Sequence, residues 1–438
     1  MNRIFTLMMG LVVAIAAAAS SADADDWLRF RGKQGMGVYT SEKSFPAEFD
    51  NEKNLNWKVK LPGAGASSPI IVGDRIFVTC YSGYGQDRRD PGKISKLMRH
   101  VVCFSRTDGS KLWQKDFKPE AKEDPFSGMG VPEHGYSSST PVSDGKKLYV
   151  FFGKSGVYAF DLDGNQLWKK SVGTGSGRMR WGSGASPVLH NNVLVINATD
   201  EANAIVGLNT EDGEEVWKAD DISNAWMTPL VAGEGDQATL ILSVPGEIWG
   251  MNPAKGKLRW YTTNGVQDIS VSASPMLNGD KVVAMGGRSR TGVSVKLGGK
   301  GDVTKSHTVW SGRAIGRIMT PVIYDGHIFA ISGGIATCAD AESGEEVFRS
   351  RLPSAGDSSP QRRGPSGDYC SPVIVDGKLI QFTKKGVCYV IAAKSKFELL
   401  ATNTFKDDGS EFNSTPSFAD GNMYVRSNRF LYSIGAQE

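Results

Sequence analysis

Short apolar strands separated by tight turns recur along the chain from residue 67 to its C-terminal end. In the first example, an apolar run from Ile70 to Val72 follows a proline, Gly73-Asp74 provides a turn, and Ile76 to Thr79 is β-branched and aromatic. Proline is tolerated at the first residue of a strand, and such turns are typical of hairpins. The pattern predicts a β-hairpin, which cannot bury its apolar faces alone.

Eight copies of this unit are marked by a proline that follows a small or hydroxyl residue. These prolines are Pro69, Pro141, Pro187, Pro229, Pro275, Pro321, Pro372 and Pro416. Their successive spacings are 72, 46, 42, 46, 46, 51 and 44 residues, so the period is about 45 residues with one long first step. A strand that runs into a turn and then an aromatic residue follows the hairpins, which gives four strands per repeat. The fold class predicted is all-β, an eight-bladed β-propeller of four-stranded antiparallel blades.

A column of large aromatic residues near the end of each repeat predicts how the blades pack. It comprises Trp57, Trp113, Trp168, Trp217, Trp260 and Trp310, with Phe348 and Leu400 in the weaker repeats. Small residues recur on the third strand, namely Cys103, Ala159, Gly207, Gly250, Cys338 and Ser433. A large ring needs a shallow seat, so the two columns are complementary and the tryptophans are interpreted as structural.

The five cysteines leave the disulfide question open. Cys103 and Cys338 occupy the small-residue column and are most simply buried apolar residues. Five is an odd number, so at least one thiol is unpaired. Cys80 could face Cys103, and Cys370 and Cys388 share one repeat, but a core of this size does not need disulfides.

Residues 1–24 are predicted to be a secretory signal peptide. Arg3 precedes an apolar run from Ile4 to Ala19, and Ala22-Asp23-Ala24 forms a small-residue cleavage site. A membrane anchor is the alternative, but the run is shorter than the ~20 residues that a spanning helix needs. We therefore expect an exported protein, periplasmic or extracellular after cleavage.

Residues 25–56 form a non-repeat lead-in to the propeller of residues 57–438. Trp57 to Lys60 resembles a fourth strand whose three partners are absent at this end, and the last repeat lacks its own fourth strand. The two ends are therefore expected to complete one blade, which closes the ring and removes its sheet edges.

Charge and hydropathy narrow the range of partners. The chain has 50 Lys and Arg against 47 Asp and Glu, a formal charge of +3 that is too weak to indicate nucleic-acid binding. No stretch beyond the N-terminus is long and apolar enough to span a bilayer. We expect a monomer that is not an integral membrane protein.

The Ser-x-Pro strands, the Gly-Asp and Asp-Gly turns and the Asp-x-x-x-Gly-x-x-x-Trp endings resemble pyrroloquinoline-quinone-type (PQQ-like) propeller repeats over roughly residues 57–434. The Trp57 strand, Val244-Pro245-Gly246 and Trp27 to Gly32 look more like secreted bacterial PQQ-like repeat proteins than like the large dehydrogenases. In repeat type the chain resembles the propeller subunit of the outer-membrane protein assembly machinery. That family member is a lipoprotein, whereas this chain has no Cys near the predicted cleavage point.

In propellers, residues just before the first strand of each blade point to the channel mouth, where ligands usually bind. The candidates selected there are His134, Tyr136, Arg180, Trp181, Trp226, Arg317, Asp368, Tyr369 and Asn413. Side chains that vary around one rim of an otherwise repetitive fold are the best candidates for a site. The aromatic and Arg members suit a planar, anionic or sugar-like ligand. The alternative is a hydrated rim that binds nothing.

The leading functional hypothesis is a non-catalytic binding or scaffold protein of the bacterial cell envelope, with envelope proteins or glycans as partners and no cofactor. The resemblance also implies an alternative, a PQQ- and Ca²⁺-dependent dehydrogenase of alcohols or aldose sugars. Oxygen ligands are available from Glu133, Asp268, Asp368, Asn224 and Asn413, although their spacing does not mark a set. The adjacent Cys-Cys pair of many such enzymes is absent. A third hypothesis is carbohydrate or peptide recognition through the aromatic rim.

Two irregular segments are interpreted without a catalytic role. Gly83 to His100, the insertion in the long first step, carries five basic residues and is predicted to be a surface loop. The glycine-rich run Gly173 to Gly177 lies between blades with no helix after it, so a connector is favoured over a phosphate-binding loop.

Overall fold

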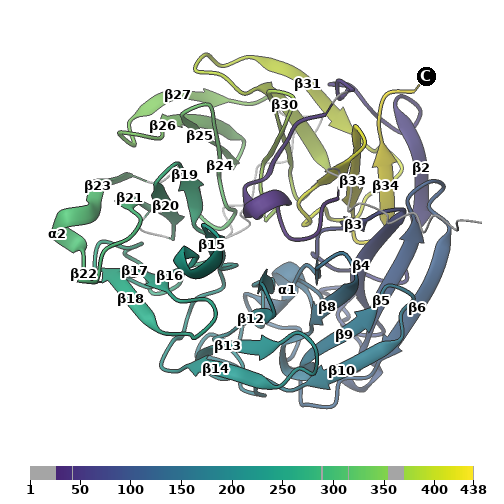
Figure 1. The fold of residues 1–438 in the computed structure, drawn as a ribbon. Helices are drawn as coiled ribbons and strands as arrows, with labels where there is room; N and C mark the ends of the chain where they lie inside the picture. Colours follow the sequence, from purple (N-terminus) through teal and green to yellow (C-terminus); the bar gives the residue numbers. More distant parts are fainter. Residues whose placement is uncertain (1–25, 42, 288–289, 314, 354–368, 438) are drawn as a thin grey trace, which may run out of the picture.

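The computed structural model describes residues 26–41, 43–287, 290–313, 315–353 and 369–437. Its strands form eight sheets arranged as blades around one axis (Figure 1). The predicted eight-bladed β-propeller is confirmed. The predicted signal peptide lies outside the described residues.

Each blade is a four-stranded antiparallel meander that runs from the axis outward (Figure 1). Blade 1 contains β3 (Ile70–Val72), β4 (Arg75–Ser82), β5 (Met98–Ser105) and β6 (Lys111–Phe117). Blade 2 contains β7 (Val142–Ser143), β8 (Lys147–Phe151), β9 (Val157–Asp161) and β10 (Gln166–Lys170). Blade 3 contains β11 (Val188–His190), β12 (Val193–Ala198), β13 (Ala204–Asn209) and β14 (Glu215–Ala219). Blade 4 contains β15 (Leu230–Ala232), β16 (Thr239–Val244), β17 (Glu247–Met251) and β18 (Leu258–Thr262).

The other four blades follow the same order. Blade 5 contains β19 (Met276–Asn278), β20 (Lys281–Gly286), β21 (Thr291–Lys296) and β23 (Thr308–Arg313). Blade 6 contains β24 (Val322–Tyr324), β25 (His327–Ser332), β26 (Ile335–Asp340) and β27 (Glu346–Arg351). Blade 7 contains β28 (Val373–Val375), β29 (Lys378–Phe382), β30 (Val387–Ala392) and β31 (Leu399–Thr404). Blade 8 contains β32 (Ser417–Ala419), β33 (Asn422–Arg426), β34 (Phe430–Ile434) and, from the other end of the chain, β2 (Leu55–Lys60).

A ring of hydrogen bonds joins the eight blades at the inner ends of their sheets. In every blade the residue before the first-strand proline is Ser or Thr, and its hydroxyl oxygen accepts the backbone N–H of the equivalent residue one blade earlier. The ring members are Ser68, Thr140, Ser186, Thr228, Ser274, Thr320, Ser371 and Thr415. The bonds are 2.8 to 3.2 Å long, and the one from Thr415 N–H to Ser68 closes the circle.

Five tryptophans of the aromatic column each reach the next blade through an indole hydrogen bond. The indole N–H of Trp168 donates to the backbone oxygen of Thr210 in blade 3 at 3.0 Å, and Gly213 of that blade lies under its ring. The equivalent N–H groups of Trp57, Trp113, Trp217 and Trp310 also donate to a carbonyl of the next blade. The small residues lie opposite the rings within the same blade, as Gly207 does opposite Trp217. Hydrophobic clusters between adjacent blades complete the core.

Blade 7 corrects one member of the predicted column. A bulge precedes the aromatic position in each outer strand, and the register there places Ala401, not Leu400, opposite Val390. Leu400 instead occupies the bulged position and is exposed, like Leu112 in blade 1. The sequence pattern misplaced it by one residue because Leu399, Leu400 and Ala401 offer no single large ring to fix the register.

The lead-in crosses one end of the channel and is seen in purple at the middle of the ring (Figure 1). It contains β1 (Val38–Tyr39), which pairs in parallel with β28, and the one-turn helix η1 (Lys33–Gly35). The buried Arg31 side chain donates to the backbone oxygens of Thr320 and Pro321 in blade 6. Desolvation lowers the pKa of Arg31 to about 9. The lead-in is therefore part of the propeller and not a flexible extension.

The predicted surface loop of blade 1 is more structured than expected. The insertion between β4 and β5 includes η2 (Ile94–Lys96), and its Tyr84 and Leu97 are buried in a small apolar cluster with Phe126. Arg88 extends from it to the carboxylate of Glu133. The other short helices are α1 (Val131–His134), η3 (Gly153–Ser155), η4 (Gly235–Gln237) and α2 (Thr304–His307).

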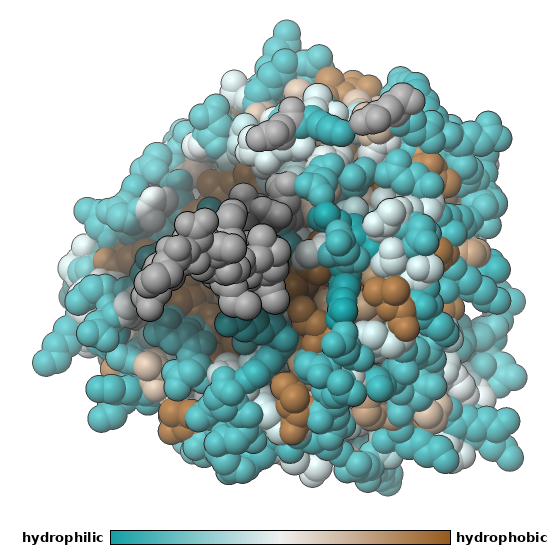
Figure 2. Space-filling view, turned by 45° about the vertical axis from the view of Figure 1, so that its right-hand side comes forward, coloured by the Kyte–Doolittle hydropathy of each residue, from teal (hydrophilic) through white to brown (hydrophobic). Residues whose placement is uncertain are grey.

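All five cysteines are free and buried, so neither of the open disulfide pairings forms. Cys103 and Cys338 are fully buried opposite the aromatic column, which agrees with their interpretation as small apolar residues. In the part of the chain that the structure describes, no helix has the length and apolar character needed to cross a membrane. The face of the molecule seen in Figure 2 is mainly hydrophilic with scattered apolar residues.

Candidate binding site at the channel mouth

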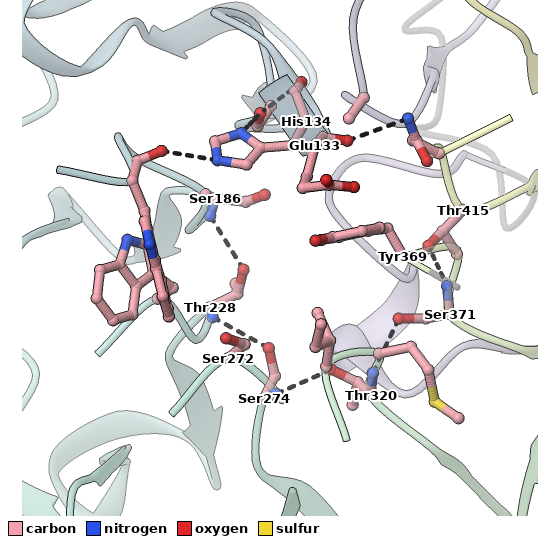
Figure 3. Close-up of a pocket in the computed structure, with 18 of the residues that line it drawn as sticks. Glu133, His134, Ser186, Thr228, Ser272, Ser274, Thr320, Tyr369, Ser371 and Thr415 are labelled. Carbon is pink, nitrogen blue, oxygen red and sulfur yellow. Dashed lines mark hydrogen bonds between the residues drawn. The ribbon is translucent and has the colours of Figure 1, made fainter. Parts of the chain in front are cut away.

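A cavity of about 200 Å³ lies on the propeller axis and is lined by residues from all eight blades. Six predicted rim residues line it: His134, Trp181, Trp226, Arg317, Tyr369 and Asn413. Hydroxyls of the ring follow its wall, while Glu133, His134 and Tyr369 project towards the open space (Figure 3). Phe30 of the lead-in also contributes to the lining. The structure thus brings most of the predicted set into one pocket.

Three predicted rim residues are not placed in this pocket. Tyr136 is buried beside it, where its hydroxyl donates to the backbone oxygen of Asp124 at 2.7 Å and its ring packs against Tyr81. Arg180 is exposed, lies in a turn with a φ of 54°, and is not among the residues that line the pocket. Asp368 lies outside the described residues.

Glu133 is the one carboxylate among the described residues that line the pocket, and two cations already hold it. One of its oxygens bonds Arg88, and the other lies 2.9 Å from Lys384 Nζ. Burial alone would raise the pKa of Glu133, but hydrogen bonds from Lys384 and Arg88 hold that pKa below its ordinary value. The carboxylate is therefore charged, neutralised and weakly basic.

His134 supports the pocket wall in its neutral form. Its Nε2–H donates to the backbone oxygen of Trp181 at 2.9 Å, since a carbonyl can only accept. Its Nδ1 contacts the hydroxyl of Ser138. Burial lowers the pKa of His134, which favours the neutral ring. His134 thus ties α1 of one blade to the segment that carries Trp181.

The aromatic wall and two polar groups are free to meet a ligand. The Trp181 and Trp226 rings lie 4.8 Å apart at 41°, and the Trp226 N–H donates to the Gly182 oxygen. The Arg317 guanidinium has no hydrogen bond or ion pair with another described residue, and Asn413 Oδ1 is buried without a hydrogen bond. The pocket therefore offers a stacking surface, a cation and one buried acceptor.

The hydroxyl ring is the part of the site that the sequence analysis missed. Ser and Thr alternate strictly before the eight repeated prolines, from Ser68 to Thr415. Each ring oxygen accepts a backbone N–H, so its own proton remains available as a donor. Regular alternation at one position of every repeat was the available signal.

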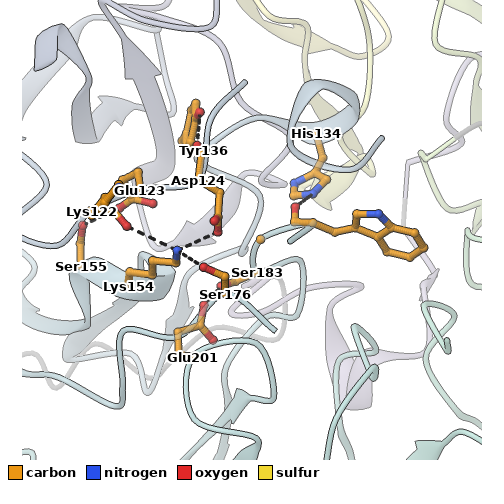
Figure 4. A network of polar contacts seen from close by, with 12 residues as sticks. Lys122, Glu123, Asp124, His134, Tyr136, Lys154, Ser155, Ser176, Ser183 and Glu201 are labelled. Carbon is orange, nitrogen blue, oxygen red and sulfur yellow. Dashed lines mark hydrogen bonds and ion pairs between the residues drawn. The ribbon is translucent and has the colours of Figure 1, made fainter. Parts of the chain in front are cut away.

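A second, smaller cavity of about 30 Å³ lies between blades 2 and 3, behind the segment that carries Trp181. Four carboxylates and two cations line it. Figure 4 shows Glu123, Asp124, Glu201 and Lys154. Arg99 pairs with Glu123, and Lys154 pairs with Asp124, both at 2.7 Å. The sequence analysis selected none of these residues, because they come from four separate segments.

Asp200 and Glu201, the other two carboxylates of this cavity, pair with no cation in the described structure. Burial, followed by repulsion from Glu201, raises the pKa of Asp200 to about 8. Burial also raises the pKa of Glu201 to about 7. The two cavities therefore hold carboxylates in opposite environments.

The pocket does not fit a Ca²⁺-bound quinone of the kind that the dehydrogenases imply. A hard cation needs several oxygen ligands, but both Glu133 oxygens are bound to cations. Asn413 Oδ1 is a single free amide oxygen. Among the residues with a defined position, no three His, Cys, Asp or Glu side chains group as a metal site.

The fold and the pocket define a PQQ-type β-propeller with a pocket of about 200 Å³ on its axis. The chain belongs to the family described as outer membrane protein assembly factor BamB, whose model matches residues 98–350, more than half of the chain. BamB of Burkholderia pseudomallei (strain K96243) is 25% identical over 191 residues, which is 42% of this chain and 47% of that relative. The match thus spans about half the length of that relative.

Solved structures of two kinds share the fold. BamB from Moraxella catarrhalis matches with a TM-score of 0.57 and 11% identity, over 87% of this chain and 99% of that one. A europium-containing methanol dehydrogenase matches with a TM-score of 0.65 and 10% identity, over 94% and 98%. The quinohemoprotein alcohol dehydrogenase of Comamonas testosteroni has the same TM-score and identity, over 96% and 82%. At these identities the likeness shows the fold alone.

Proposed function

We propose that this protein is a non-catalytic interaction platform of the bacterial cell envelope, and that the channel mouth contacts its partner. Membership of the family described as outer membrane protein assembly factor supports a location in the cell envelope and a role as an interaction platform. The family does not by itself choose a surface, because propellers host many unrelated activities. The choice of surface rests on the pocket.

The chemistry of the pocket is the observation that carries the proposal. The tilted indole pair, the ring hydroxyls and Arg317, which pairs with no other described residue, are groups that bind, and Arg317 favours an acidic or carbonyl-rich ligand. The volume of about 200 Å³ is below the ~300 to 1,000 Å³ typical of small-molecule sites. The pocket suits one or two side chains of a partner, with the exposed Met129 and Ile269 as apolar contacts near the mouth.

The state of Glu133 argues against general-base chemistry in this pocket. A general base works best with a pKa near the operating pH. The pKa of Glu133 is instead lowered by two bound cations, and His134 already uses both ring nitrogens in hydrogen bonds. These groups position the wall of the pocket.

Site-specific photocrosslinking in the producing bacterium tests the platform and its surface together. A photoreactive residue at Met129 or Ile269 should capture an envelope protein, whereas one at Leu112, exposed to the same 50% as Met129 but on an outer strand, should not. Trp181→Ala with Arg317→Ala should remove the crosslink. Capture from Leu112 alone would place the interface on the blade edges and overturn the proposed surface.

A second measurement tests the enzymatic alternative. The purified chain is titrated with PQQ, with and without Ca²⁺, and its thermal unfolding and its reduction of a redox dye with alcohols or aldose sugars are recorded. We expect neither a Ca²⁺-dependent rise in Tm nor dye reduction. A Ca²⁺-dependent rise with turnover would overturn the non-catalytic assignment, since a ligand at a hundred times its Kd adds ~2.7 kcal/mol of stability.

A further inference from the structure

The cavity between blades 2 and 3 contains two buried carboxylate oxygens without a partner. Asp200 and Glu201 follow β12, and each side chain is only 5% exposed. Among the described residues, Asp200 Oδ2 and Glu201 Oε2 accept no hydrogen bond, while Glu201 Oε1 accepts the hydroxyl of Ser183. Buried polar groups in folded proteins are normally satisfied, so these two oxygens require an explanation.

The surrounding charges leave this pair uncompensated. The two nearby cations are each bound elsewhere, Arg99 by Glu123 and Lys154 by Asp124. Lys154 also donates to Ser176 at 2.6 Å, so its ammonium is held by these partners and does not pair with Asp200 or Glu201 (Figure 4). Ionising all four carboxylates against the two cations would give the cluster a formal charge of −2, and a buried charge without a counter-ion is costly.

Glycines allow close approach to these two residues. A Cβ at Gly177, in the connector between the blades, would lie 2.4 Å from Asp200 Oδ1. A Cβ at Gly153, in η3, would lie 2.6 Å from Ser183 Oγ and 3.0 Å from Glu201 Oε1. The glycine-rich run of residues 173–177 is thus explained by close approach to the backbone of Glu201 and to the carboxylate of Asp200, and not by a phosphate ligand.

We propose that this cavity is a binding site for one small hard cation, with Asp200 and Glu201 as its carboxylate ligands. Oxygen ligands are those that Ca²⁺, Mg²⁺ and Na⁺ take in proteins, and Ser183 Oγ and water complete the set. A buried water needs roughly 10 to 15 Å³ of such space, so about 30 Å³ admits an ion with one water. No third carboxylate joins, because Glu123 and Asp124 bind Arg99 and Lys154.

The cation would join two segments. The carboxylates belong to blade 3, and Ser183 belongs to the connector between blades 2 and 3 that carries Trp181. Occupancy would therefore hold the connector behind the aromatic wall. This role is independent of what binds at the channel mouth.

Thermal unfolding of the full chain tests the site. The protein is stripped with a chelator, and Tm is measured at pH 7.5 with CaCl₂, MgCl₂ or NaCl against tetramethylammonium chloride of equal ionic strength. At least one of the three cations should raise Tm saturably, and calorimetric titration should give one site per chain. The double variant Asp200→Asn with Glu201→Gln should bind at least tenfold more weakly and show no such rise.

The cation-free double variant keeps the test decisive. Because neutral amides replace two buried carboxyl groups that pair with no cation in the described structure, it should melt at or above the temperature of the cation-free wild type, whereas a misfolded variant would melt below it. Glu215→Gln, at an exposed position on β14 of the same blade, should keep the wild-type response. The proposal fails if no cation exceeds the tetramethylammonium control or if the double variant retains the full shift. Either failure leaves the channel-mouth proposal intact, because the two tests share no residue.

Discussion

Tryptophans occupy two regions of this molecule and make different contacts in each. At the blade interfaces the indole N–H reaches a carbonyl of the next blade, as Trp168 reaches Thr210 at 3.0 Å. At the channel mouth the Trp181 and Trp226 rings contact one another at a tilt of 41°. Residues that repeat at equivalent positions hold the blades together and supply the hydroxyl wall of the pocket, whereas residues that do not repeat supply its aromatic and charged groups. In a repeat protein, departure from the repeat is therefore more informative about function than residue type.

Trp260 shows what happens when the next blade departs from the pattern. It is 1% exposed, yet its N–H has no partner in the described structure. Blade 5 replaces the usual turn with β22 (Gly301–Asp302) and α2, and β22 pairs in parallel with β18. The Trp260 ring is buried in an apolar cluster that includes Val295 and Val303.

The largest expected effect is the loss of a docking ring. Trp168→Ala should lower the free energy of unfolding by ~3 to 5 kcal/mol, because it leaves a cavity between blades 2 and 3. Trp181→Ala, which removes a partly exposed ring, should cost about 1 kcal/mol. Guanidinium denaturation monitored by circular dichroism measures both. Equal losses would remove the distinction between the two regions.

A glycine under a docking ring should be the next most sensitive position. Gly213 has a φ of 74°, and an added Cβ would lie 2.6 Å from Trp168 Cε3. Gly145 also has a positive φ, of 87°, but a Cβ there meets nothing within 4 Å. Gly213→Ala should therefore cost roughly 1 to 3 kcal/mol more than Gly145→Ala in the same denaturation experiment. A smaller difference would mean that the ring has room to move.

The indole N–H itself can be tested by replacement with phenylalanine. Trp168→Phe leaves the Thr210 carbonyl with the longer bond from the Tyr149 hydroxyl, at 3.4 Å, and should cost about 1 kcal/mol beyond the loss of ring area. Trp260→Phe removes an N–H that bonds nothing in the described structure, so only the loss of ring area should remain. Urea denaturation of the two variants gives the comparison. If Trp260→Phe were the more costly, its N–H would have to bond a group that the described residues lack.

The smallest effect concerns pH at the channel mouth. Burial lowers the folded-state pKa of His134 below its ordinary value of 6.5, so the unfolded chain binds the proton more readily. The contribution of neutral His134 to stability is full above pH 6.5 and is lost as the pH falls from there towards the lowered pKa. Unfolding titrations between pH 5 and 8 should show a smaller loss in His134→Gln than in wild type. Parallel pH profiles of wild type and His134→Gln would contradict the assignment of His134 as neutral.

The repeat made the fold predictable from the sequence. Eight proline landmarks gave the blade number, and the complementary columns around Trp217 and Gly207 gave the packing within and between blades. The closing of blade 8 by β2 followed from the lone Trp57 strand. Positions without a large ring were assigned wrongly, as Leu400 was, because the register of a strand can be read from the sequence only where a distinctive side chain marks it.

The site was predictable only where it lies on the repeat. His134, Trp226 and Asn413 were found because they stand at a fixed offset from a proline, and the structure gathers them in one pocket. Tyr136 stands at a similar offset, but the apolar cluster around Tyr81 and Tyr84 buries it beside the pocket. Asp200 and Glu201 could not be selected, since their environment depends on contacts between a loop, a connector and a short helix that share no spacing.

The pairing of β2 with β34 has a consequence for how the molecule is made. β2 is synthesised early, but its partner strand lies near the end of the sequence. During translation β2 therefore waits as an open strand edge, which is a liability for aggregation. Closure of the ring is then the last step of biogenesis, and any chain shortened before β34 remains an unclosed arc with two exposed edges.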